Sequence, residues 1–336
     1  MKRSGICCGG NWVVDEIKII EAWPEEERLV TILSEEKGTG GAPYNVLIDL
    51  RNIDSKIYLE AVGVIGKDEN GKKILSDIKN YRLNPVKIEQ TDILPTSRTY
   101  VMTVAKTGRR TFFHNRGTNV LLDIHHFDFK RIRAEILHIG YALLLDKLDL
   151  PDKTFGTRMA RLLSKAKNNG LKTSLDVVSE NNPAKFQNIV IPSLKFTDYL
   201  IINELEASLI TGINLTHTLN PEHYRKASKV LFKMGVNSIV VIHRPEAAYG
   251  FLSSGDIFIQ PSHKVPENFV KGTVGAGDAF SAAILYSITK RWHLSKALKI
   301  AVATAALSLS SASATGGVPS FSSILKFSEK TPYKRI

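Results

Sequence analysis

Short apolar segments rich in β-branched residues alternate with longer amphipathic segments along most of the chain. Residues 57–64 precede a helical pattern at 68–81, and residues 199–202 precede another at 204–210. Such segments are typical of βαβ units, in which the strands are parallel and helices cover both faces of the sheet. The pattern therefore predicts an α/β fold with a Rossmann-like, mainly parallel sheet flanked by helices on both faces.

Two segments interrupt this alternation, and each is typical of a pair of strands. Residues 16–33 surround the turn Trp23-Pro24-Glu25-Glu26, and residues 97–114 surround the turn Lys106-Thr107-Gly108-Arg109. We expect the two hairpins to form a small β-sheet that acts as a lid. The predicted organisation is an α/β nucleotide- and substrate-binding core and a β lid, made respectively by residues 1–15, 34–96 and 117–336 and by residues 16–33 and 97–116.

The composition is that of a globular protein with a sizeable core. Of the 336 residues, 43% are hydrophobic and 23% are charged. No apolar run approaches the length needed to span a bilayer, and the first ten residues lack an apolar stretch long enough for a signal peptide. The only cysteines, Cys7 and Cys8, are neighbours in a predicted strand, where geometry disfavours a disulfide between them. We therefore expect a cytoplasmic protein without a membrane partner.

The formal net charge of +12 suits an anionic ligand. A nucleic-acid-binding protein is one alternative, but the basic residues are scattered, and no arginine-rich arm, zinc pattern or aromatic RNA motif accompanies them. A small anion such as a nucleotide is the favoured partner.

The strongest chemical signal is the glycine-rich turn at residues 272–280, Gly-Thr-Val-Gly-Ala-Gly-Asp-Ala-Phe, which leads into an apolar helix. Small residues let the backbone approach a ligand, and free N–H groups at the start of a helix attract a phosphate. Asp278 is the single carboxylate in this turn. Its negative charge beside a phosphate makes sense if it accepts a proton from an attacking hydroxyl. The alternative is a first-turn residue stabilised by the helix dipole, an effect of about 0.3–1 kcal/mol.

This turn resembles the second signature of the ribokinase-like (PfkB) family of carbohydrate kinases, Asp-Thr-x-Gly-Ala-Gly-Asp. Three further segments resemble the family in the same order along the chain: residues 10–15 (Gly-Asn-Trp-Val-Val-Asp), 40–45 (Gly-Gly-Ala-Pro-Tyr-Asn) and 203–206 (Asn-Glu-Leu-Glu). The resemblance covers nearly the whole chain. It implies an ATP-dependent kinase that phosphorylates a hydroxymethyl group of a sugar or sugar derivative, and a homodimer formed through the lid.

The resemblance also implies roles for individual residues. Asp278 is the general base, and backbone N–H groups just before it stabilise the transferring group, those of Gly275, Ala276 and Gly277. The substrate-binding residues are Asp15, Gly40, Gly41, Asn45, Phe112 and Arg116. The residues that bind ATP are Asn203, Glu206, His243, Thr273, Gly275 and Gly277. Of these, Asn203 and Glu206 also hold Mg²⁺, mostly through water, as suits a cation that dehydrates reluctantly.

Each of several polar residues also has a purely structural interpretation. Asp15 can cap a turn, and Asn45 can be an ordinary polar helix residue. Asn203 and Glu206 have the spacing of a capping box, which is compatible with ligand binding. His138, at the end of a predicted strand, is favoured as a core histidine that hydrogen-bonds to the backbone.

The sequence departs from the family pattern at two places. Gly272 replaces the aspartate that helps hold an activating monovalent cation, so we do not expect potassium activation; either the ammonium of Lys271 or nothing fills that role. Pro245 and Ala248 lie where relatives carry a flexible glycine-containing turn around the nucleotide, which predicts altered nucleotide contacts. Two further functions therefore stay open: a nucleoside kinase, and a catalytically weak sugar- or nucleotide-binding sensor.

Overall fold

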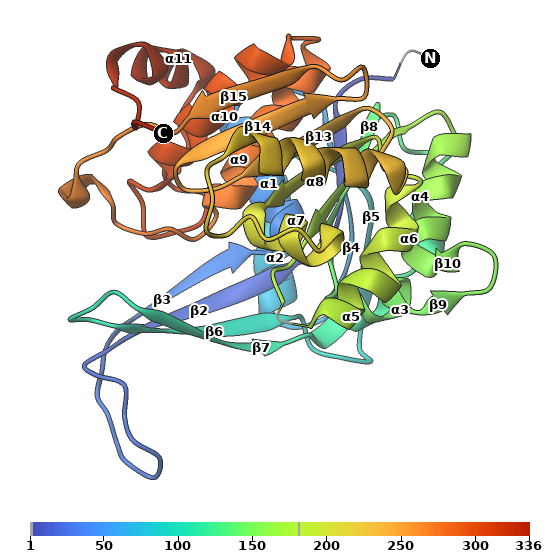
Figure 1. Ribbon diagram of the computed structural model, residues 1–336. Coiled ribbons are helices and arrows are strands. Elements are labelled where there is room, and N and C mark those ends of the chain that lie inside the picture. Colours follow the sequence, from blue (N-terminus) through green and yellow to red (C-terminus); the bar gives the residue numbers. More distant parts are fainter. Residues whose placement is uncertain (1–2, 181) are drawn as a thin grey trace.

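A large, mainly parallel sheet forms the centre of the molecule (Figure 1). The computed structural model describes residues 3–180 and 182–336, and within these ranges the sheet has the strand order β15-β14-β13-β12-β11-β8-β1-β4-β5. Neighbours are parallel from β13 to β5, whereas β14 and β15 are antiparallel. Its strands are β1 Ile6–Gly10, β4 Leu59–Gly66, β5 Asn84–Thr91, β8 Ile136–Ala142, β11 Lys172–Val177, β12 Tyr199–Asn203, β13 Ile239–His243, β14 Ala247–Leu252 and β15 Ile257–Pro261.

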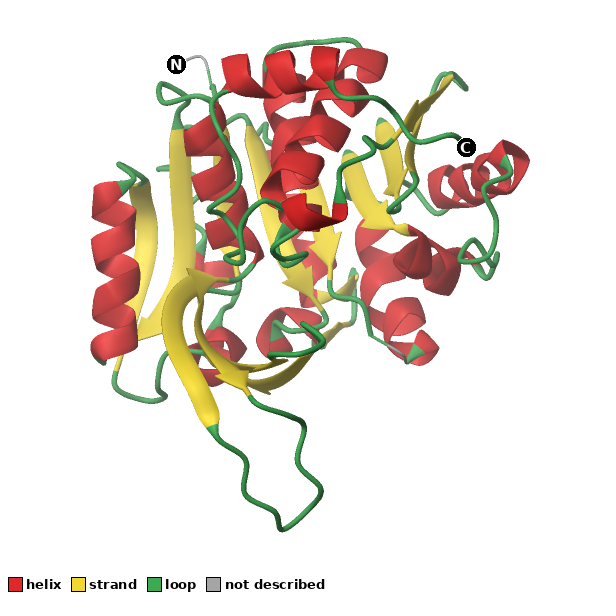
Figure 2. Cartoon of the chain, turned by 90° about the vertical axis from the view of Figure 1, so that its left-hand side faces the viewer, coloured by secondary structure: helices red, strands yellow, loops and turns green. Residues whose placement is uncertain are grey.

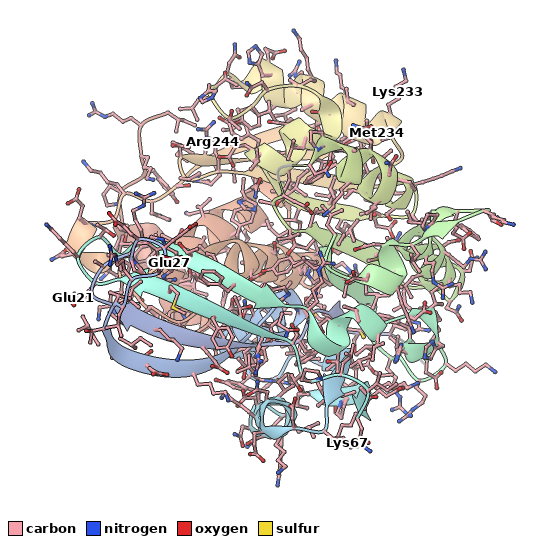
Figure 3. The ribbon with its side chains drawn as sticks, turned by 90° about the horizontal axis from the view of Figure 1, so that it is seen from below. Glu21, Glu27, Lys67, Lys233, Met234 and Arg244 are labelled. Carbon is pink, nitrogen blue, oxygen red and sulfur yellow. The ribbon has the colours of Figure 1, made fainter. Side chains whose placement is uncertain are left out.

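A second, four-stranded sheet forms the lid and curves beneath the central sheet (Figure 2). Its order is β3-β2-β6-β7, with strands β2 Val13–Ile20, β3 Ile32–Gly40, β6 Arg98–Val104 and β7 Arg110–Asn115. Glu21 and Glu27, labelled in Figure 3, belong to the long loop that joins β2 to β3 at the outer end of the lid. A separate two-stranded pair consists of β9 Pro151–Asp152 and β10 Gly156–Thr157.

Helices cover both faces of the central sheet, and each group buries its own hydrophobic core. One face carries α1 Ala42–Ile53, α2 Glu69–Asn80, α9 Ala276–Thr289, α10 Leu294–Ser308 and α11 Phe321–Lys330. The other carries α3 Asp146–Asp149, α4 Arg158–Asn168, α6 Ile191–Leu194, α7 Glu204–Thr211 and α8 Pro221–Lys233, with α5 Pro183–Lys185 leading into α6. This is the layer arrangement that alternating strands and helices produce.

The central strands are buried on both faces, which explains their nearly continuous apolar sequences. Every residue of β1 and β4 is buried, including the two free thiols of Cys7 and Cys8. Glu60 is tolerated inside β4 because its carboxylate accepts hydrogen bonds from the backbone N–H groups of Arg133 and Ala134.

Trp12 fixes the base of the lid, because it lies between the end of β1 and the start of β2. Its ring is fully buried, and its indole N–H donates to the carbonyl of Val62 over 2.9 Å. The backbone of Trp12 exchanges two hydrogen bonds with the side chain of Asn119. A Cβ atom at Gly63 would lie 2.2 Å from the Trp12 ring, so a glycine is needed beneath it. These contacts hold β2, and therefore Asp15, at the carboxyl edge of the sheet.

The structure confirms the predicted fold class but gives the lid other strand boundaries. Residues 13–15 and 34–40, which the sequence assigned to the core, belong to β2 and β3, and the predicted turn at 23–26 lies within a longer loop. The charged segment Ser34-Glu35-Glu36-Lys37 shows no apolar alternation because this part of β3 is exposed to solvent. Among the helices of the described residues, none is long and apolar enough to cross a membrane.

Candidate active site

The carboxyl ends of the parallel strands and the inner face of the lid enclose a cavity of about 450 Å³. Ligands of open α/β sheets bind at this edge. Separate parts of the chain contribute the carboxylates, amides and phenol that line it: Asn11, Asp15, Asn45, Tyr141, Asp176, Asn203, Glu206 and Asp278. The fold thus brings together the carboxylates and amides that the sequence motifs singled out.

Asp278 lies in the first turn of α9, and only 5% of its surface is exposed. The amide nitrogen of Asn45 donates to Oδ2 of Asp278 over 2.7 Å, and the hydroxyl of Tyr141 lies 3.1 Å from both carboxylate oxygens. The other amide atom of Asn45, Oδ1, is buried and has no hydrogen-bond partner among the described residues. These contacts fix the carboxylate and leave one acceptor free beside it.

Burial makes the carboxylates of this cavity more basic than ordinary aspartates. It raises the pKa of Asp278 to about 6, although hydrogen bonds from Asn45 and Tyr141 act in the opposite direction and the charge of Asp15 adds to the rise. Burial also raises the pKa of Asp15 to about 6, against a lowering by its hydrogen bond with Thr99. At neutral pH a group with a pKa near 6 is mostly ionised and accepts a proton more readily than an ordinary aspartate.

Asn203 and Glu206 form the capping box that their spacing predicts, and both also line the cavity. The amide of Asn203 and the hydroxyl of Ser179 donate to Oε1 of Glu206, over 2.8 and 2.7 Å. Burial raises the pKa of Glu206 to about 7. It also raises the pKa of Asp176 well above the ordinary range, and the charges of Asp278 and Glu206 add to that rise.

Four carboxylates on the walls of one cavity repel each other and provide hard oxygen ligands, so the side chains fit a divalent cation such as Mg²⁺. They are not close enough together to form an all-protein cage. Within the described part of the chain, the one group of three ligating residues with ligand atoms within 4.8 Å of each other is Glu89, His125 and His126, which do not line this cavity. A cation here would therefore keep much of its water.

The glycine-rich turn presents the start of α9 to the cavity. Gly275 is the N-cap with a φ of 81°, and a Cβ atom there would lie 2.2 Å from the carbonyl oxygen of Ala314. Only glycine satisfies both conditions. The N–H groups of Gly277 and Asp278 lie in the first turn, where an α-helix supplies no acceptor, whereas the N–H of Ala276 makes a long bond of 3.4 Å to Thr273. The turn thus offers N–H groups and the positive end of the helix dipole to an anion.

A second cavity of about 520 Å³ adjoins the first and shares Asn203, His243 and Gly277 with it. Its apolar wall is formed mainly by Phe280, Val302, Ala305, Ala306 and Leu309, and Thr273 and Ala276 also line it. The ring of His243 packs on Phe280 at 4.7 Å, and burial lowers the pKa of His243 to about 4, so the ring is neutral at pH 7. This apolar wall suits the planar nucleobase of a nucleotide, and the phosphates of the nucleotide would then point toward the first cavity.

The segment around Pro245 forms another wall of the second cavity, where the chain departs from the resemblance. Pro245 lines the cavity, and its carbonyl accepts a hydrogen bond of 2.8 Å from the ammonium of Lys334. Ala248, in contrast, is a fully buried residue of β14 and does not line the cavity. Of Pro245 and Ala248, only Pro245 therefore contributes to the wall of this cavity.

The inner face of the lid covers the first cavity with Phe112, His114 and Thr99. Phe112 remains 55% exposed, and the hydroxyl of Thr99 lies 3.0 Å from Nδ1 of His114. The lid strand β2 contributes Asp15 beside them. The structure thus places Phe112 on the wall of the first cavity, and its role toward a substrate stays a prediction.

Other predicted residues lie beside the cavity or away from it. Gly40 does not line the cavity, but a Cβ atom there would come within 2.3 Å of Oδ2 of Asp15, so Gly40 makes room for that carboxylate. Arg116 does not line the cavity, and its guanidinium pairs with Asp146 over 2.8 Å. Lys271 is exposed and lines neither cavity. His138 is buried in β8, where its Nδ1 contacts the hydroxyl of Ser174 at 3.1 Å rather than a backbone atom.

Sequence motifs missed several polar groups of the cavity, among them Asn11, Tyr141 and Asp176. Asn11 stands within a recognised segment, where its side chain accepts a hydrogen bond from the backbone N–H of Tyr141. Tyr141 and Asp176 lie near the carboxyl ends of the apolar strands β8 and β11. Their position at the ends of apolar strands was the available signal, since such ends meet at one edge of a parallel sheet.

Comparison with known proteins identifies the family of the chain. The sequence profile of the pfkB family carbohydrate kinases matches residues 10–320. A ribokinase of Haemophilus influenzae is 23% identical over 298 residues, covering 86% of this chain and 87% of the relative. A nucleoside kinase of Methanocaldococcus jannaschii is 21% identical over 329 residues, covering 98% of each chain.

The solved structure of Arabidopsis thaliana ribokinase complexed with ribose and ATP has the same fold, with a TM-score of 0.80 at 22% identity, covering 98% of this chain and 99% of that one. The resemblance proposed from the motifs is confirmed by the profile match over nearly the whole chain. The protein is a member of the pfkB family of carbohydrate kinases and thus a phosphotransferase that acts on an alcohol group.

Proposed function

We propose that the protein transfers the γ-phosphoryl group of ATP to a hydroxymethyl group of a sugar or sugar derivative, with Asp278 as the general base. One observation carries the proposal. Asp278 is a buried carboxylate, held by Asn45 and Tyr141, at the start of a helix whose Gly277 lines both cavities. A hydroxyl in the first cavity and a phosphate at the helix start would meet at this carboxylate.

The proposed binding mode follows from the hydrogen-bonding groups. Asp15 and the unpartnered Oδ1 of Asn45 are acceptors suited to the hydroxyls of a polyol, and Gly41 lines the cavity beside them. A Cβ atom at Gly41 would lie 2.0 Å from the carbonyl oxygen of Asn11, which explains the glycine. The adenine of ATP would lie in the second cavity, against the apolar wall and beside His243.

In the proposed reaction the substrate oxygen attacks the γ-phosphorus while the bond to the β-phosphate oxygen breaks, and Asp278 takes the hydroxyl proton. The N–H groups of the glycine-rich turn stabilise charge on the transferring group, Gly277 most directly, and closure of the lid excludes water. Mg²⁺ held by Asn203, Glu206 and Asp176, largely through water, would neutralise phosphate charge. The protein's own contribution is positioning and proton acceptance.

The titration of Asp278 gives a prediction for the pH dependence. A raised pKa means that the carboxyl becomes protonated, and useless as a base, as the pH falls through about 6. We expect kcat/KM for the polyol to fall about tenfold per pH unit below that value and to level off above pH 7. Initial rates between pH 5 and 8, in buffers of constant ionic strength, measure this. A value of kcat/KM that stays constant down to pH 5 would contradict the assignment of the base.

A coupled ADP-release assay tests the proposed activity across ketoses, aldoses, sugar acids, sugar phosphates and nucleosides. We propose that no monovalent cation is required, because Gly272 has no carboxylate, so potassium and choline buffers should give equal rates.

A nucleoside kinase is the second candidate, supported by end-to-end similarity to a nucleoside kinase. Faster turnover of nucleosides than of any sugar would favour it.

The proposal also covers the location and the oligomeric state of the enzyme. The buried free thiols of Cys7 and Cys8 support a reducing, cytoplasmic location. A homodimer through the lid is supported by apolar side chains exposed on and near the β2–β3 loop, among them Trp23, at 50% exposure, and Leu29, at 95%.

A further inference from the structure

A third cavity, of about 250 Å³, adjoins the one that holds Asp278, and the two share Asp15, Phe112 and Val274 as walls. The other walls of the third cavity come from the lid, from α1 and α2, and from residues 312–315. A polyol bound to Asp15 with its hydroxymethyl group at Asp278 can therefore extend its opposite end toward this third cavity.

Arg110 is the first residue of β7 and lines the third cavity. Side chains alternate along a strand, so Arg110 lies on the same face of β7 as Phe112 and His114, which cover the first cavity. A guanidinium nitrogen of Arg110 donates to the carbonyl of Ala312 over 3.4 Å, and a Cβ atom at Gly272 would lie 3.0 Å from that nitrogen. The guanidinium thus lies between the lid and the glycine-rich turn.

Arg110 has no counterion within the described residues: no carboxylate oxygen lies within 4.0 Å of its guanidinium. Asp77, on the wall of the third cavity, is already engaged. Its Oδ2 accepts hydrogen bonds from Thr39 over 2.6 Å and Tyr44 over 3.3 Å, and lies 3.5 Å from the ammonium of Lys73. Lys73 therefore has a counterion in this cavity and Arg110 does not.

The partly buried position of Arg110 is unfavourable for an unpaired charge. Burial lowers its pKa, and no neighbouring charge compensates. A desolvated cation without a partner is stabilised by an anion that enters the cavity. The phosphates of a nucleotide do not suit as this anion, because they are expected near Asn203, which lines the first and second cavities. Arg110 lines neither of these two cavities.

We propose that Arg110 binds an anionic group, a carboxylate or a phosphate, at the end of the substrate opposite the hydroxymethyl group. The inference rests on the proposed function and narrows its substrate class to sugar acids or sugar phosphates. The planar guanidinium pairs with either anion through two parallel N–H···O bonds, which adds orientation to affinity. The phosphorylated hydroxyl is then the one farthest from the charge.

The test compares neutral sugars, the corresponding sugar acids and the corresponding sugar phosphates, all of equal carbon number. Steady-state kinetics are measured for the wild type and for Arg110→Gln, with Arg109→Gln as the matched control. Arg109 is exposed in the loop before β7 and does not line the third cavity. Calorimetric titration of the same compounds into Asp278→Asn gives binding constants that do not depend on turnover.

We expect the wild type to use one anionic class on the order of 100-fold better than the neutral sugars, and Arg110→Gln to lose most of that preference through KM. The winning class distinguishes carboxylate from phosphate. Arg110→Gln should leave kcat/KM for neutral sugars within about threefold, and Arg109→Gln should match the wild type.

If Arg110→Gln lowers kcat/KM equally for charged and neutral compounds, the role of Arg110 is only to hold the lid against residue 312. That result would overturn the inference. Binding constants for Asp278→Asn that do not depend on the charge of the compound would also overturn it. Turnover of neutral sugars without any preference for anions contradicts this inference alone. Charge-dependent binding without turnover of any compound contradicts the proposed function and leaves Arg110 as the anion site.

Discussion

Replacing Asp278 with asparagine is expected to lower kcat about a thousandfold while KM for the polyol changes little. The amide oxygen can still accept hydrogen bonds from Asn45 and Tyr141, which now hold the carboxylate at 2.7 and 3.1 Å, so the geometry of the cavity should persist. What disappears is the acceptor for the substrate proton. Steady-state rates at saturating ATP, together with calorimetric binding of the polyol, separate loss of chemistry from loss of binding.

Asp49→Asn provides a matched control within the same core. Asp49 is fully buried in α1, and neither of its carboxylate oxygens has a hydrogen-bond partner among the described residues. Burial and the charge of Asp278 raise its pKa well above the ordinary range, which favours the neutral carboxyl. The substitution preserves the size of the side chain, and activity should stay within about threefold of the wild type. Near-normal turnover of Asp278→Asn would remove the general base from the account.

The second large effect is expected for Gly275→Ala. The methyl group would lie 2.2 Å from the carbonyl oxygen of Ala314, and the residue would retain a φ of 81°, which an alanine disfavours. Relief of this clash must move the turn and with it the first N–H groups of α9. Loss of one such donor typically costs about 100- to 1000-fold in kcat, and the backbone strain adds about 1–3 kcal/mol of instability. Turnover and thermal unfolding of the purified variant measure both.

Gly277→Ala serves as the stability control two residues further along. The nearest atom to a Cβ there is Cε1 of His243 at 3.8 Å, an ordinary contact. Because the position is helical, alanine should keep or slightly raise the melting temperature. Equal melting temperatures for Gly275→Ala and the wild type would mean that the turn tolerates a side chain and does not depend on close backbone approach.

The parts of the site that local sequence predicts are those with local causes. The glycine-rich turn can be recognised in the sequence because Gly275 needs a positive φ. Asn203 and Glu206 can be recognised because a capping box has a fixed spacing. The alternation of strands and helices predicts the layers of the fold because the hydrophobic period of each element is also a local property. Each of these signals requires only a few neighbouring residues.

The remaining parts depend on contacts between distant segments. Tyr141 meets Asp278 only because β8 and α9 end at the same edge, and Asp176 joins them from β11. The sequence alone also fits a solvated residue of a charged hairpin for Arg110, whereas in the structure its guanidinium donates to the carbonyl of Ala312 beside Gly272. Arg116, a few residues further along the chain, instead pairs with Asp146 at the surface. No local pattern distinguishes these two arginines.

The account depends most on phosphoryl transfer to an alcohol at Asp278, and ³¹P NMR of the reaction mixture measures that directly. With ATP, Mg²⁺ and the best polyol of the substrate panel, we expect a phosphomonoester signal that grows in equal amount with ADP. The analogue lacking the hydroxymethyl oxygen should give none. Release of inorganic phosphate regardless of the polyol, or no phosphomonoester with any sugar, sugar derivative or nucleoside, would contradict the account.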